Sequence, residues 1–510
     1  MVKENSRITE LHYIRDYFTS GVWSNTDLGE KHASFGNFLY RPLFMLVLNL
    51  GYQSWATNAV AYHALNIALH GINTILLFYI ILGLSSGRET VPAFFGALLF
   101  AVHPVHVESI AWIAGLTDPL VSIFLLSNFL LYRHYLLSGR ILYAGLALVC
   151  YGAGLMSKEV AVFFPAVLII HDWILSRSSL RRILPYLVLL VVYFIARAIA
   201  LGDGIALERF HFSNLPTLIE YFLRYIQLLV FPWPLEFYVG GPSSNLPAIG
   251  IGALVMLAGL FVAAGAYRNR DPLPLLGAAW FVITLLPALP IALLEDPVFA
   301  IRVLYLPSAG LALVVAWLYP RMRGKVLTIR TAWGVLLVFA VFSIVEISDW
   351  KDEVTFHLRA IESNPESAVP YEGLARAYER NGNLNKAAES YLRAAALARE
   401  ENRRLIYLED AAVLFGQQGD ITNSEHSYRE ILDRDPQHSS AWVGMGNNAW
   451  ARNDMQRAIE FYLKAYDANP NNYVASYNLS IAYQKLGNYE QAQYFENIAR
   501  RLKSSSTPPE

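Results

Sequence analysis

The chain has 510 residues, of which 55% are hydrophobic, 13% are aromatic and only 16% are charged, and its mean hydropathy is +0.33. Soluble domains carry about 25% charged residues, so this composition excludes an ordinary soluble enzyme, a disordered chain and a collagen-like chain. A single cysteine excludes a disulfide-linked scaffold. The formal net charge of −1 leaves no basic surface for nucleic acid, so no nucleic-acid partner is expected.

Charge is unevenly distributed between two parts of the chain. Residues 1–350 contain 22 Lys/Arg and 19 Asp/Glu, whereas residues 351–510, less than half as many, contain 18 and 22. The first part is typical of a membrane protein and the second of a water-soluble domain, with the boundary near Trp350. We predict an all-α protein, in which a polytopic membrane bundle is followed by a helical solenoid.

The first part contains ten apolar segments, each about as long as a helix that crosses a hydrocarbon core ~30 Å thick. We therefore predict about ten spans within a membrane domain at residues 57–350. The segments are 57–82, 92–112, 117–136, 141–157, 160–176, 183–201, 246–267, 273–293, 302–320 and 331–348.

Residues 217–235 differ from these ten segments. They are aromatic, they include Glu220 and Arg224, and they are interrupted by Pro232 and Pro234. This pattern favours an interfacial helix that lies along the membrane surface. The alternative is an eleventh span.

The Lys/Arg content of the short loops predicts the orientation in the membrane. Loops on one side hold twelve of these residues and loops on the other side hold four, so the first side is expected to be cytoplasmic. Ten spans then place residues 1–56 and the C-terminal part outside the cytoplasm. The first thirty residues are polar and contain no signal peptide. We therefore expect either a first span that inserts with its amino end outside or a natural chain that begins further upstream.

Residues 351–503 repeat with a period of 34, as the interval between Pro436 and Pro470 shows. Small and aromatic residues recur at matching positions, and the pattern resembles about four tetratricopeptide repeats. Stacked repeats form a concave surface that commonly binds a protein or an extended peptide. A rigid spacer or an oligomerisation surface is the alternative. The tail at residues 504–510 is expected to be disordered.

Ionisable residues at membrane depth are rare and usually functional. Four cations are predicted near the extracytoplasmic ends of spans: Arg41, Lys158, Arg197 and Arg302. Three further groups on the same side could handle a proton or cap a helix: His103, Glu108 and Asp118. His103 and His106, with Glu108, could also be read as metal ligands, but a third confident ligand is missing, so a divalent metal is disfavoured. Interfacial helix caps, and a neutral ion pair between Lys158 and Glu159, are the structural alternatives.

Cations gathered at a membrane interface suit a lipid-linked phosphate or diphosphate, and several buried arginines without an anion would be costly. We therefore expect an extracytoplasmic site for a lipid-linked sugar, with the four cations as phosphate ligands. No nucleotide-binding glycine loop is present. The lipid-linked donor would be a substrate, and no cofactor is predicted.

The order of four motifs, followed by the repeats, resembles the transmembrane-and-tetratricopeptide-repeat O-mannosyltransferase family within the GT-C glycosyltransferase superfamily. The motifs are Tyr40-Arg41-Pro42-Leu43, His103-Pro104-Val105-His106-Val107-Glu108-Ser109, Ser157-Lys158-Glu159 and Arg302-Val303-Leu304-Tyr305-Leu306-Pro307-Ser308. The resemblance implies an integral, multi-pass membrane protein with extracytoplasmic repeats. It also implies transfer of a sugar, typically mannose, from a polyprenyl-phosphate carrier to a Ser/Thr hydroxyl.

By this resemblance Arg302 and Arg197 would contact the donor phosphate, while His103 and Glu108 would shape the site or hold the acceptor. The family's presumed catalytic acidic pair would lie before Met1, which implies a chain that lacks its first span or an inactive homologue. Ile301 stands where the family often has Glu. Two other functions stay open: a non-catalytic membrane scaffold for an envelope or secretory assembly, and a lipid-linked-oligosaccharide ligase or polymerase.

Overall fold

The structure is a computed structural model that describes residues 5–22, 39–85, 89–175, 180–202, 211–235, 239–240, 246–269, 271–294, 298–322 and 326–506. The chain divides into two compact units, Met1–Lys351 and Asp352–Glu510. Both are helical, which confirms the all-α class. One two-residue antiparallel pair, β1 (Val239–Gly240) with β2 (Val298–Phe299), is the exception in the described ranges.

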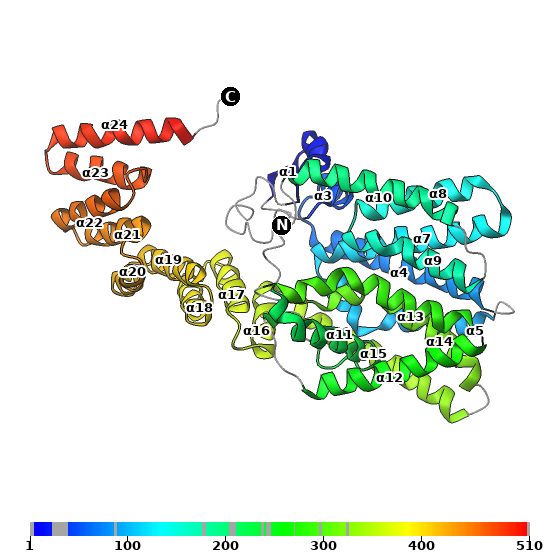
Figure 1. The fold of residues 1–510 in the computed structure, drawn as a ribbon. Coiled ribbons are helices and arrows are strands. Elements are labelled where there is room, and N and C mark those ends of the chain that lie inside the picture. The colour runs from blue at the N-terminus through cyan, green and yellow to red at the C-terminus, as the bar shows by residue number, and fades with distance from the viewer. Residues whose placement is uncertain are drawn as a thin grey trace. The chain divides into compact units, whose positions relative to one another are not determined.

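The first unit is a bundle of α-helices (Figure 1) joined by short 3₁₀ helices, which are numbered with η in the text. Its elements, in chain order, are α1 (Ser6–Thr9), η1 (Leu11–Phe18), α3 (Pro42–Trp55), α4 (Ala59–Leu84), α5 (Thr90–Val102), η2 (Pro104–His106), α6 (Val107–Ala111), η3 (Ile113–Leu116), α7 (Thr117–Ser138), α8 (Ile141–Leu155), η4 (Glu159–Phe163), α9 (Phe164–Ile174), α10 (Leu180–Leu201), η6 (Phe212–Asn214), α11 (Leu215–Val230), α12 (Leu246–Asn269), α13 (Pro272–Leu285), η7 (Leu286–Leu293), η8 (Ile301–Leu304), α14 (Ser308–Met322), α15 (Val326–Ile347) and η9 (Ser348–Trp350).

All ten apolar segments predicted from the sequence contain a helix, but the helices differ in length. Six are long and apolar enough to cross a membrane, and α5 with the helices after Pro104, bent by 49°, would make a seventh within the described ranges. The other three, α8, α9 and α14, have only 15, 11 and 15 residues. They are shorter than expected because the chain leaves helical geometry where polar residues and prolines interrupt the apolar runs. The protein is a multi-pass membrane protein.

The predicted interfacial helix corresponds to α11, which ends at Val230, ahead of Pro232 and Pro234. Nine of its 16 residues are buried, Arg224 among them. The helix packs against α12 and η7. Most residues of α11 are therefore buried against the bundle, which the sequence pattern did not predict. The placement of α11 along a membrane surface stays a prediction.

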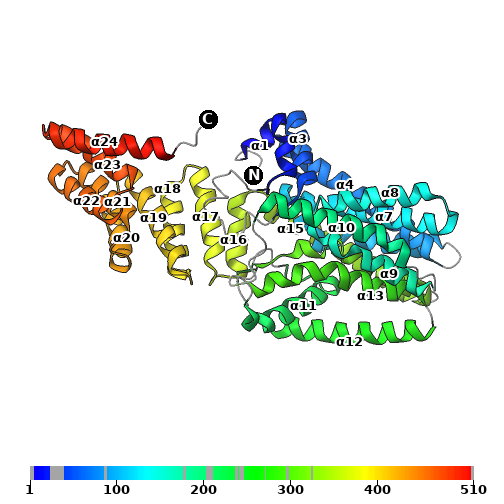
Figure 2. The same ribbon diagram turned by 45° about the horizontal axis from the view of Figure 1, so that its top comes forward.

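The largest core of the first unit lies among α4, α5, α7, α8, α9, α10, α13 and α14. Figures 1 and 2 show α7 to α10 on one side of this unit and α11 with α12 on the other. Large aromatic side chains fill the core, and rings within it meet edge to face, as Trp280 does with Phe129 and Phe164 at centroid separations of 5.4 Å. Such contacts add to the stabilisation from burial.

Several helix crossings in the described part of this unit require glycine, as two of them show. A Cβ on Gly277 of α13 would lie 2.6 Å from the carbonyl oxygen of Gly310 in α14. A Cβ on Gly252 of α12 would lie 2.0 Å from the carbonyl oxygen of Leu223 in α11. Small residues allow helix backbones in a membrane to approach closely, and here the approach holds α11 against α12.

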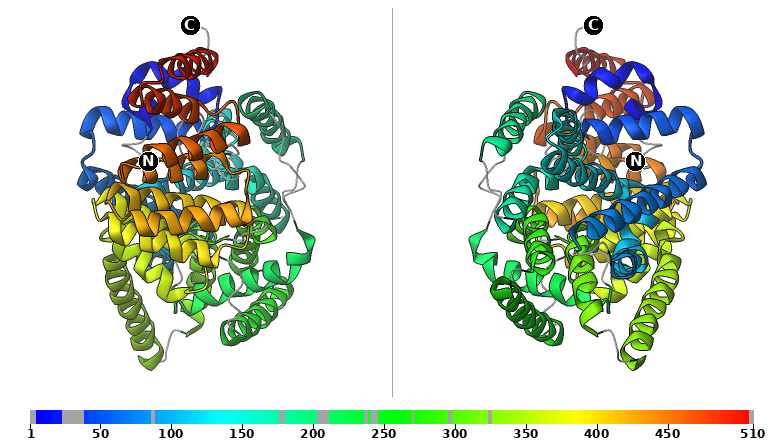
Figure 3. Two further views of the ribbon diagram at one scale, coloured as in Figure 1. Left: turned by 90° about the vertical axis from the view of Figure 1, so that its left-hand side faces the viewer. Right: turned by 90° about the vertical axis from the view of Figure 1, so that its right-hand side faces the viewer.

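The second unit contains four helix pairs preceded by α16, which stack one on the next (Figure 3). Its helices are α16 (Glu353–Ser363), α17 (Ala368–Arg380), α18 (Leu384–Leu397), α19 (Glu401–Gln417), α20 (Ile421–Arg434), α21 (Ser439–Ala451), α22 (Met455–Ala468), α23 (Tyr473–Lys485) and α24 (Tyr489–Ser506). The predicted repeats are thus present. Ser504–Ser506, expected in a disordered tail, end α24, and residues 507–510 lie outside the described residues.

The turn inside each helix pair needs a left-handed residue. Gly382, Gly419 and Gly487 have φ values of 74°, 78° and 76°, and Asn453 takes the equivalent place in the third pair with φ 60°. Glycine has no Cβ to clash in this conformation, and asparagine tolerates it better than most residues. These turns repeat at the period of the sequence and return the chain so that the pairs can stack.

We predict that Gly252→Ala destabilises the detergent-solubilised protein. Alanine normally favours a helix over glycine by up to about 1 kcal/mol, but its Cβ would strike the Leu223 carbonyl, and such overpacking costs about 1–3 kcal/mol. Thermal unfolding should therefore occur at a lower temperature. Gly259→Ala on the same helix is the control, because a Cβ there meets nothing within 4 Å. Equal melting temperatures for the two variants would show that α11 and α12 do not pack closely at Gly252.

A second prediction concerns His357 of α16, whose ring fills the space beside Gly373. Burial lowers the pKa of His357 to about 4, whereas an unfolded histidine has a pKa of about 6.5. The unfolded chain thus binds more protons between these values, and the contribution of His357 to stability is complete above pH 6.5 and is lost as the pH falls towards 4.

At pH 5 this loss should amount to roughly 1–2 kcal/mol relative to pH 7. Urea unfolding of residues 352–510, followed by circular dichroism at both pH values, measures it. His357→Gln should reduce the pH dependence by that amount, while the exposed His426→Gln should leave it unchanged. The same pH dependence in wild type and His357→Gln would show that another group is responsible.

Candidate functional site

The candidate site lies where helices of the first unit begin or break. Pro104 follows the end of α5, and the chain then turns through η2 and α6 to the start of α7. A second break, between α8 and η4, carries Lys158 and Glu159, and a third is η8, which carries Arg302. The breaks let ionisable side chains from distant segments meet across the bundle.

Glu108 and Arg302 form the first of three ion pairs. Glu108 is 1% exposed, and its Oε2 accepts a 2.8 Å hydrogen bond from the backbone N–H of Arg302 while Oε1 accepts from Nη1. The Arg302 guanidinium also lies 5.0 Å from the ring centroid of Trp112. Ile301, beside Arg302, carries no charge, and the carboxylate partner of Arg302 comes from α6.

Asp118 and Lys158 form the second pair, with 2.5 Å between Nζ and Oδ1. Asp118 is the second residue of α7, and its carboxylate is buried. In the described part of the chain its other oxygen, Oδ2, has no hydrogen-bond partner. A buried carboxylate oxygen without a donor is rare in folded proteins, so Asp118 retains an unused acceptor.

Arg41 and Glu159 form the third pair. The Arg41 guanidinium donates to both carboxylate oxygens of Glu159, at 2.7 Å from Nη2 and 3.1 Å from Nε. Arg41 immediately precedes α3, and the pair therefore joins α3 to the break after α8. Lys158 and Glu159, which the sequence offered as partners of each other, instead bind Asp118 and Arg41.

The three pairs lie close enough to influence one another. Lys158 interacts electrostatically with Arg41 and Arg302 as well as with Asp118, and Glu159 interacts with Arg197 of α10. The four predicted cations thus lie near one another, together with three carboxylates. Sequence reasoning found the cations but paired none of them correctly.

His103 and His106 take structural positions beside this cluster. The Nε2 atom of His103 hydrogen-bonds to the carbonyl oxygen of Leu229 at 2.9 Å, and its Nδ1 accepts from the N–H of Val105. The Nε2 atom of His106 bonds the hydroxyl of Ser308 at 2.8 Å. Within the described residues no group of three metal-ligating side chains occurs.

A buried polar stripe on α4 escaped the sequence analysis. Asn66 donates to the carbonyls of Ile110 and Trp112 at 3.1 Å, and Asn73 donates to the Tyr305 hydroxyl at 3.2 Å. The imidazole of His70, between them, bonds the same hydroxyl at 2.8 Å. The spacing 66, 70 and 73 on an apolar helix places all three residues on one face, and this pattern could have revealed them.

The stripe fixes the two breaks of the site against one straight helix. Asn66 binds the segment after α6, and His70 with Asn73 binds Tyr305, three residues after Arg302. Hydrogen bonds from a rigid element hold such irregular backbone in place where no water is available. α4 is thus the scaffold that positions Glu108 and Arg302.

A second buried ionic cluster surrounds Asp172 at the end of α9. Asp172 accepts hydrogen bonds from Tyr132 at 2.6 Å, from His171 at 3.2 Å and from Arg182 at 3.3 Å. These contacts join α7, α9 and α10. Three donors satisfy the Asp172 carboxylate, and the cluster ties the helices together at a point separate from the three pairs.

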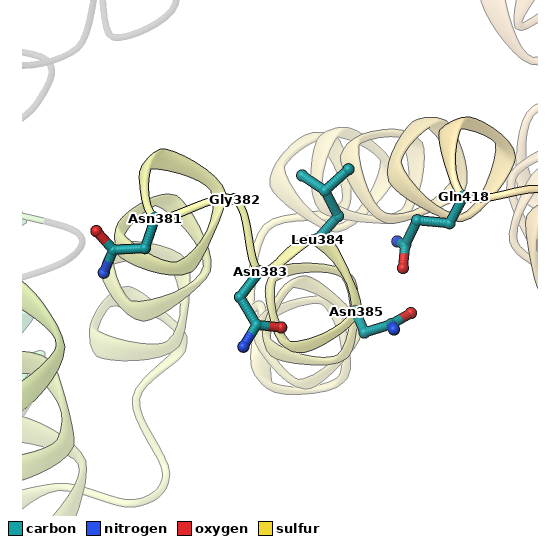
Figure 4. Close-up of a pocket in the computed structure, with 6 residues that line it drawn as sticks. All are labelled: Asn381, Gly382, Asn383, Leu384, Asn385 and Gln418. Carbon is teal, nitrogen blue, oxygen red and sulfur yellow. The ribbon is translucent and has the colours of Figure 1, made fainter.

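The repeat unit contains a surface pocket at the turn between α17 and α18 (Figure 4). It is lined by Asn381, Gly382, Asn383, Leu384, Asn385 and Gln418. Asn383 caps α18 by accepting from the N–H of Lys386. Amide groups line the pocket, and its lining residues include no nucleophile or acid. The pocket therefore reflects the capped turn between the helices and has no groups for catalysis.

Comparison with known proteins agrees with both units. Models of the tetratricopeptide-repeat family match residues 371–405, 409–473 and 461–494. Among solved structures, MamA from Desulfovibrio magneticus RS-1 is similar with a TM-score of 0.27 at 13% identity, over 37% of this chain and 99% of that one.

Curated relatives extend into the membrane unit. Protein O-mannosyl-transferase TMTC3 of Mus musculus is 22% identical over 93% of this chain and 61% of its own length. Protein O-mannosyl-transferase F38B6.6 of Caenorhabditis elegans is 26% identical over 76% and 56%, respectively. The chain thus spans about three fifths of the length of these relatives. Its homologues over most of its length are TMTC O-mannosyl-transferases, which confirms the resemblance in the motifs.

The buried pairs predict a non-additive mutational response. Asp118→Asn leaves the Lys158 ammonium in a dry environment without its counter-charge, which typically costs 3–5 kcal/mol. We expect a large fall in the melting temperature of the solubilised protein, and Asp118→Asn/Lys158→Met should recover much of it. Glu496→Gln, which removes an exposed partner of Arg500, should leave the melting temperature almost unchanged. If the falls in melting temperature from the two single substitutions simply added in the double variant, Asp118 and Lys158 would not interact.

Proposed function

We propose that this protein is a membrane glycosyltransferase that moves a sugar, mannose by analogy with the names of its relatives, from a polyprenyl-phosphate carrier to a hydroxyl of a protein. The convergence of Arg41, Lys158, Arg197 and Arg302 is the observation that carries the proposal. Phosphate is the anion that such a cation cluster at a membrane surface suits best.

The two pairs on α6 and α7 are asymmetric in a way that supports this assignment. The Arg302 side chain is 28% exposed and its partner Glu108 is 1% exposed, and Lys158 is 15% exposed against 7% for Asp118. In each pair the carboxylate lies behind the cation. It holds the cation in place, and the exposed part of the cation would be the part that meets a ligand.

The transfer chemistry assigns different tasks to these groups. The acceptor oxygen attacks the anomeric carbon, the bond from that carbon to the phosphate oxygen breaks, and the hydroxyl proton must go to a base. Arg302, Arg197, Arg41 and Lys158 would stabilise the phosphate that leaves. Of the candidates His103, Glu108 and Asp118, only Asp118 keeps an unpartnered carboxylate oxygen in the described residues, so we assign the proton to Asp118.

The proposed topology places this site on the extracytoplasmic side. The twelve-to-four bias of Lys/Arg between the two sets of loops supports it. Residues 1–56 would form an extracytoplasmic segment, residues 57–350 the GT-C-like membrane domain, and residues 351–503 the repeats on the same side. Asp16, in η1, and Asp27, which lies outside the described residues, are weaker alternatives for the base.

One observation favours a second candidate, a non-catalytic membrane scaffold that organises an assembly through its repeats. Arg41, Lys158 and Arg302 already have carboxylate partners in the structure without any ligand. A purely structural role would explain these pairs. It gives no reason for four cations to lie near one another, since like charges repel.

We predict that Arg302→Ala lowers sugar transfer by at least about 100-fold, because loss of one preorganised donor to a developing anion commonly has this effect. The assay follows radiolabelled mannose from a polyprenyl-phosphate donor to a hydroxyl-bearing peptide, with the full chain in lipid vesicles. Arg302→Lys should retain part of the activity, since lysine keeps the charge but loses the bidentate geometry.

Arg321→Ala is the matched control, because Arg321 pairs with Asp271 on an exposed surface and should transfer sugar like the wild type. Because Asp118→Asn also destabilises the fold, it tests the proton assignment only when transfer is expressed per folded molecule, and this value should still fall well below that of the wild type. Undiminished transfer by Arg302→Ala, with the melting temperature retained, would remove the donor assignment. Absence of transfer by the wild-type chain would favour the scaffold.

A further inference from the structure

Two adjacent helices of the repeat unit are almost free of charge. α21 (Ser439–Ala451) has no charged residue, and α23 (Tyr473–Lys485) has only Lys485, at its last position. Residues 351–510 as a whole are rich in charge, with 18 Lys/Arg and 22 Asp/Glu. Because α21 packs against α23, the two helices present one continuous surface, which we call the uncharged face.

Two carboxamides cross the centre of the uncharged face. Asn478 Nδ2 donates to Asn447 Oδ1 at 3.1 Å, and Tyr462 donates to the same oxygen at 2.8 Å. These bonds fix the orientation of both amides. In the described part of the chain the Nδ2 group of Asn447 and the Oδ1 atom of Asn478 have no recorded hydrogen-bond partner. The pair thus presents one donor and one acceptor side by side.

Apolar side chains flank these amides on α23. Val474 and Tyr477 are each 46% exposed, and the Tyr477 ring stacks on Tyr473 at a centroid separation of 5.7 Å. Positions 474, 477 and 478 share one side of the helix. Charged groups at the edges are already engaged, since Arg452 pairs with Glu425 at 2.6 Å and Lys485 lies 4.7 Å from the ring centroid of Trp450.

We propose that the uncharged face binds an extended, uncharged stretch of polypeptide, which under the proposed function would belong to the acceptor. An extended chain offers N–H and C=O groups that pair with a fixed acceptor and donor, and small side chains would pack on Val474 and Tyr477. A charged segment would lose hydration at this face without meeting a counter-charge. Partner selection here rests on the absence of charge.

The pocket of Figure 4 does not compete for this role. Its asparagines are exposed, and Asn383 is occupied in capping α18. Asn385, exposed at the start of α18, therefore provides a matched asparagine outside the uncharged face. The same substitution at Asn447 and at Asn385 separates a specific effect from a general effect of added charge.

The test measures binding directly, so its result does not depend on sugar transfer. The probes are three fluorescein-labelled twelve-residue peptides: one of Ser, Thr, Ala and Gly only, one in which every third residue is Lys, and one in which it is Glu. Fluorescence anisotropy with the full chain in detergent gives each Kd. We expect the uncharged peptide to bind at least tenfold more tightly than either charged peptide.

Asn447→Asp is the decisive variant. Aspartate can still accept from Tyr462 and Asn478, so the local fold is retained, but the Nδ2 donor is replaced by a negative charge. Affinity for the uncharged peptide should fall about fivefold or more, which corresponds to one lost hydrogen bond, and affinity for the Lys peptide should rise. Tyr477→Ala should also weaken the uncharged peptide, whereas Asn385→Asp should change nothing.

Three results would overturn the proposal: equal affinities for the three peptides, no measurable binding of the uncharged peptide, or identical affinities for the wild type and Asn447→Asp. Failure of the glycosyltransferase proposal would look different. In that case the uncharged peptide would bind as expected but would receive no sugar from the polyprenyl-phosphate donor.

Discussion

The membrane unit depends on one constraint: a cation withdrawn from water needs a carboxylate within reach. The penalty for a lone buried ion is several kcal/mol, and Glu108, Asp118 and Glu159 remove it for Arg302, Lys158 and Arg41. Each pair joins segments far apart in the chain, so charge neutralisation also fixes the tertiary structure. The same pairs bring Arg302 and Arg41 near Lys158, where mutual repulsion would otherwise separate them. The arrangement of these charged residues is therefore an outcome of the fold's own electrostatics.

These contacts require interrupted helices. A straight span buries its side chains along one apolar face, whereas the bend of 49° after α5 turns Glu108 towards η8. The interrupted backbone exposes polar groups that have no water to bind, and the side chains of Asn66, His70 and Asn73 take part in satisfying them. One regular helix, α4, thus stabilises the irregular segments by supplying hydrogen-bond partners for their backbone. We infer that substitutions in this stripe would act on the site through position and not through contact with substrate.

The sequence predicted the parts of the fold that follow from local patterns. Apolar runs located every helix of the ten segments, and the 34-residue period located the repeats, because both depend on residues near one another in the chain. Pairing is a different problem. Lys158 stands next to Glu159, yet it binds Asp118, 40 residues earlier, because the backbone at the break directs the neighbouring side chains to different partners. The burial of α11 was also missed, since Glu220 and Arg224 suggested contact with the membrane surface. The fit of Gly252 against Leu223 depends on tertiary structure that composition does not encode.

The distribution of charge marks a different candidate binding surface in each of the two units. In the first unit charges are few, and three buried ion pairs lie near one another at the site for which we propose a phosphate ligand. In the second unit charges are frequent and mostly exposed, and their absence from α21 and α23 is the distinctive feature. A surface without charge discriminates against ions by leaving them unpaired, which is how polar sites commonly reject a wrong partner. A transferase that modifies hydroxyls would need both properties: one site that holds a phosphate and one that selects neutral, hydroxyl-rich polypeptide.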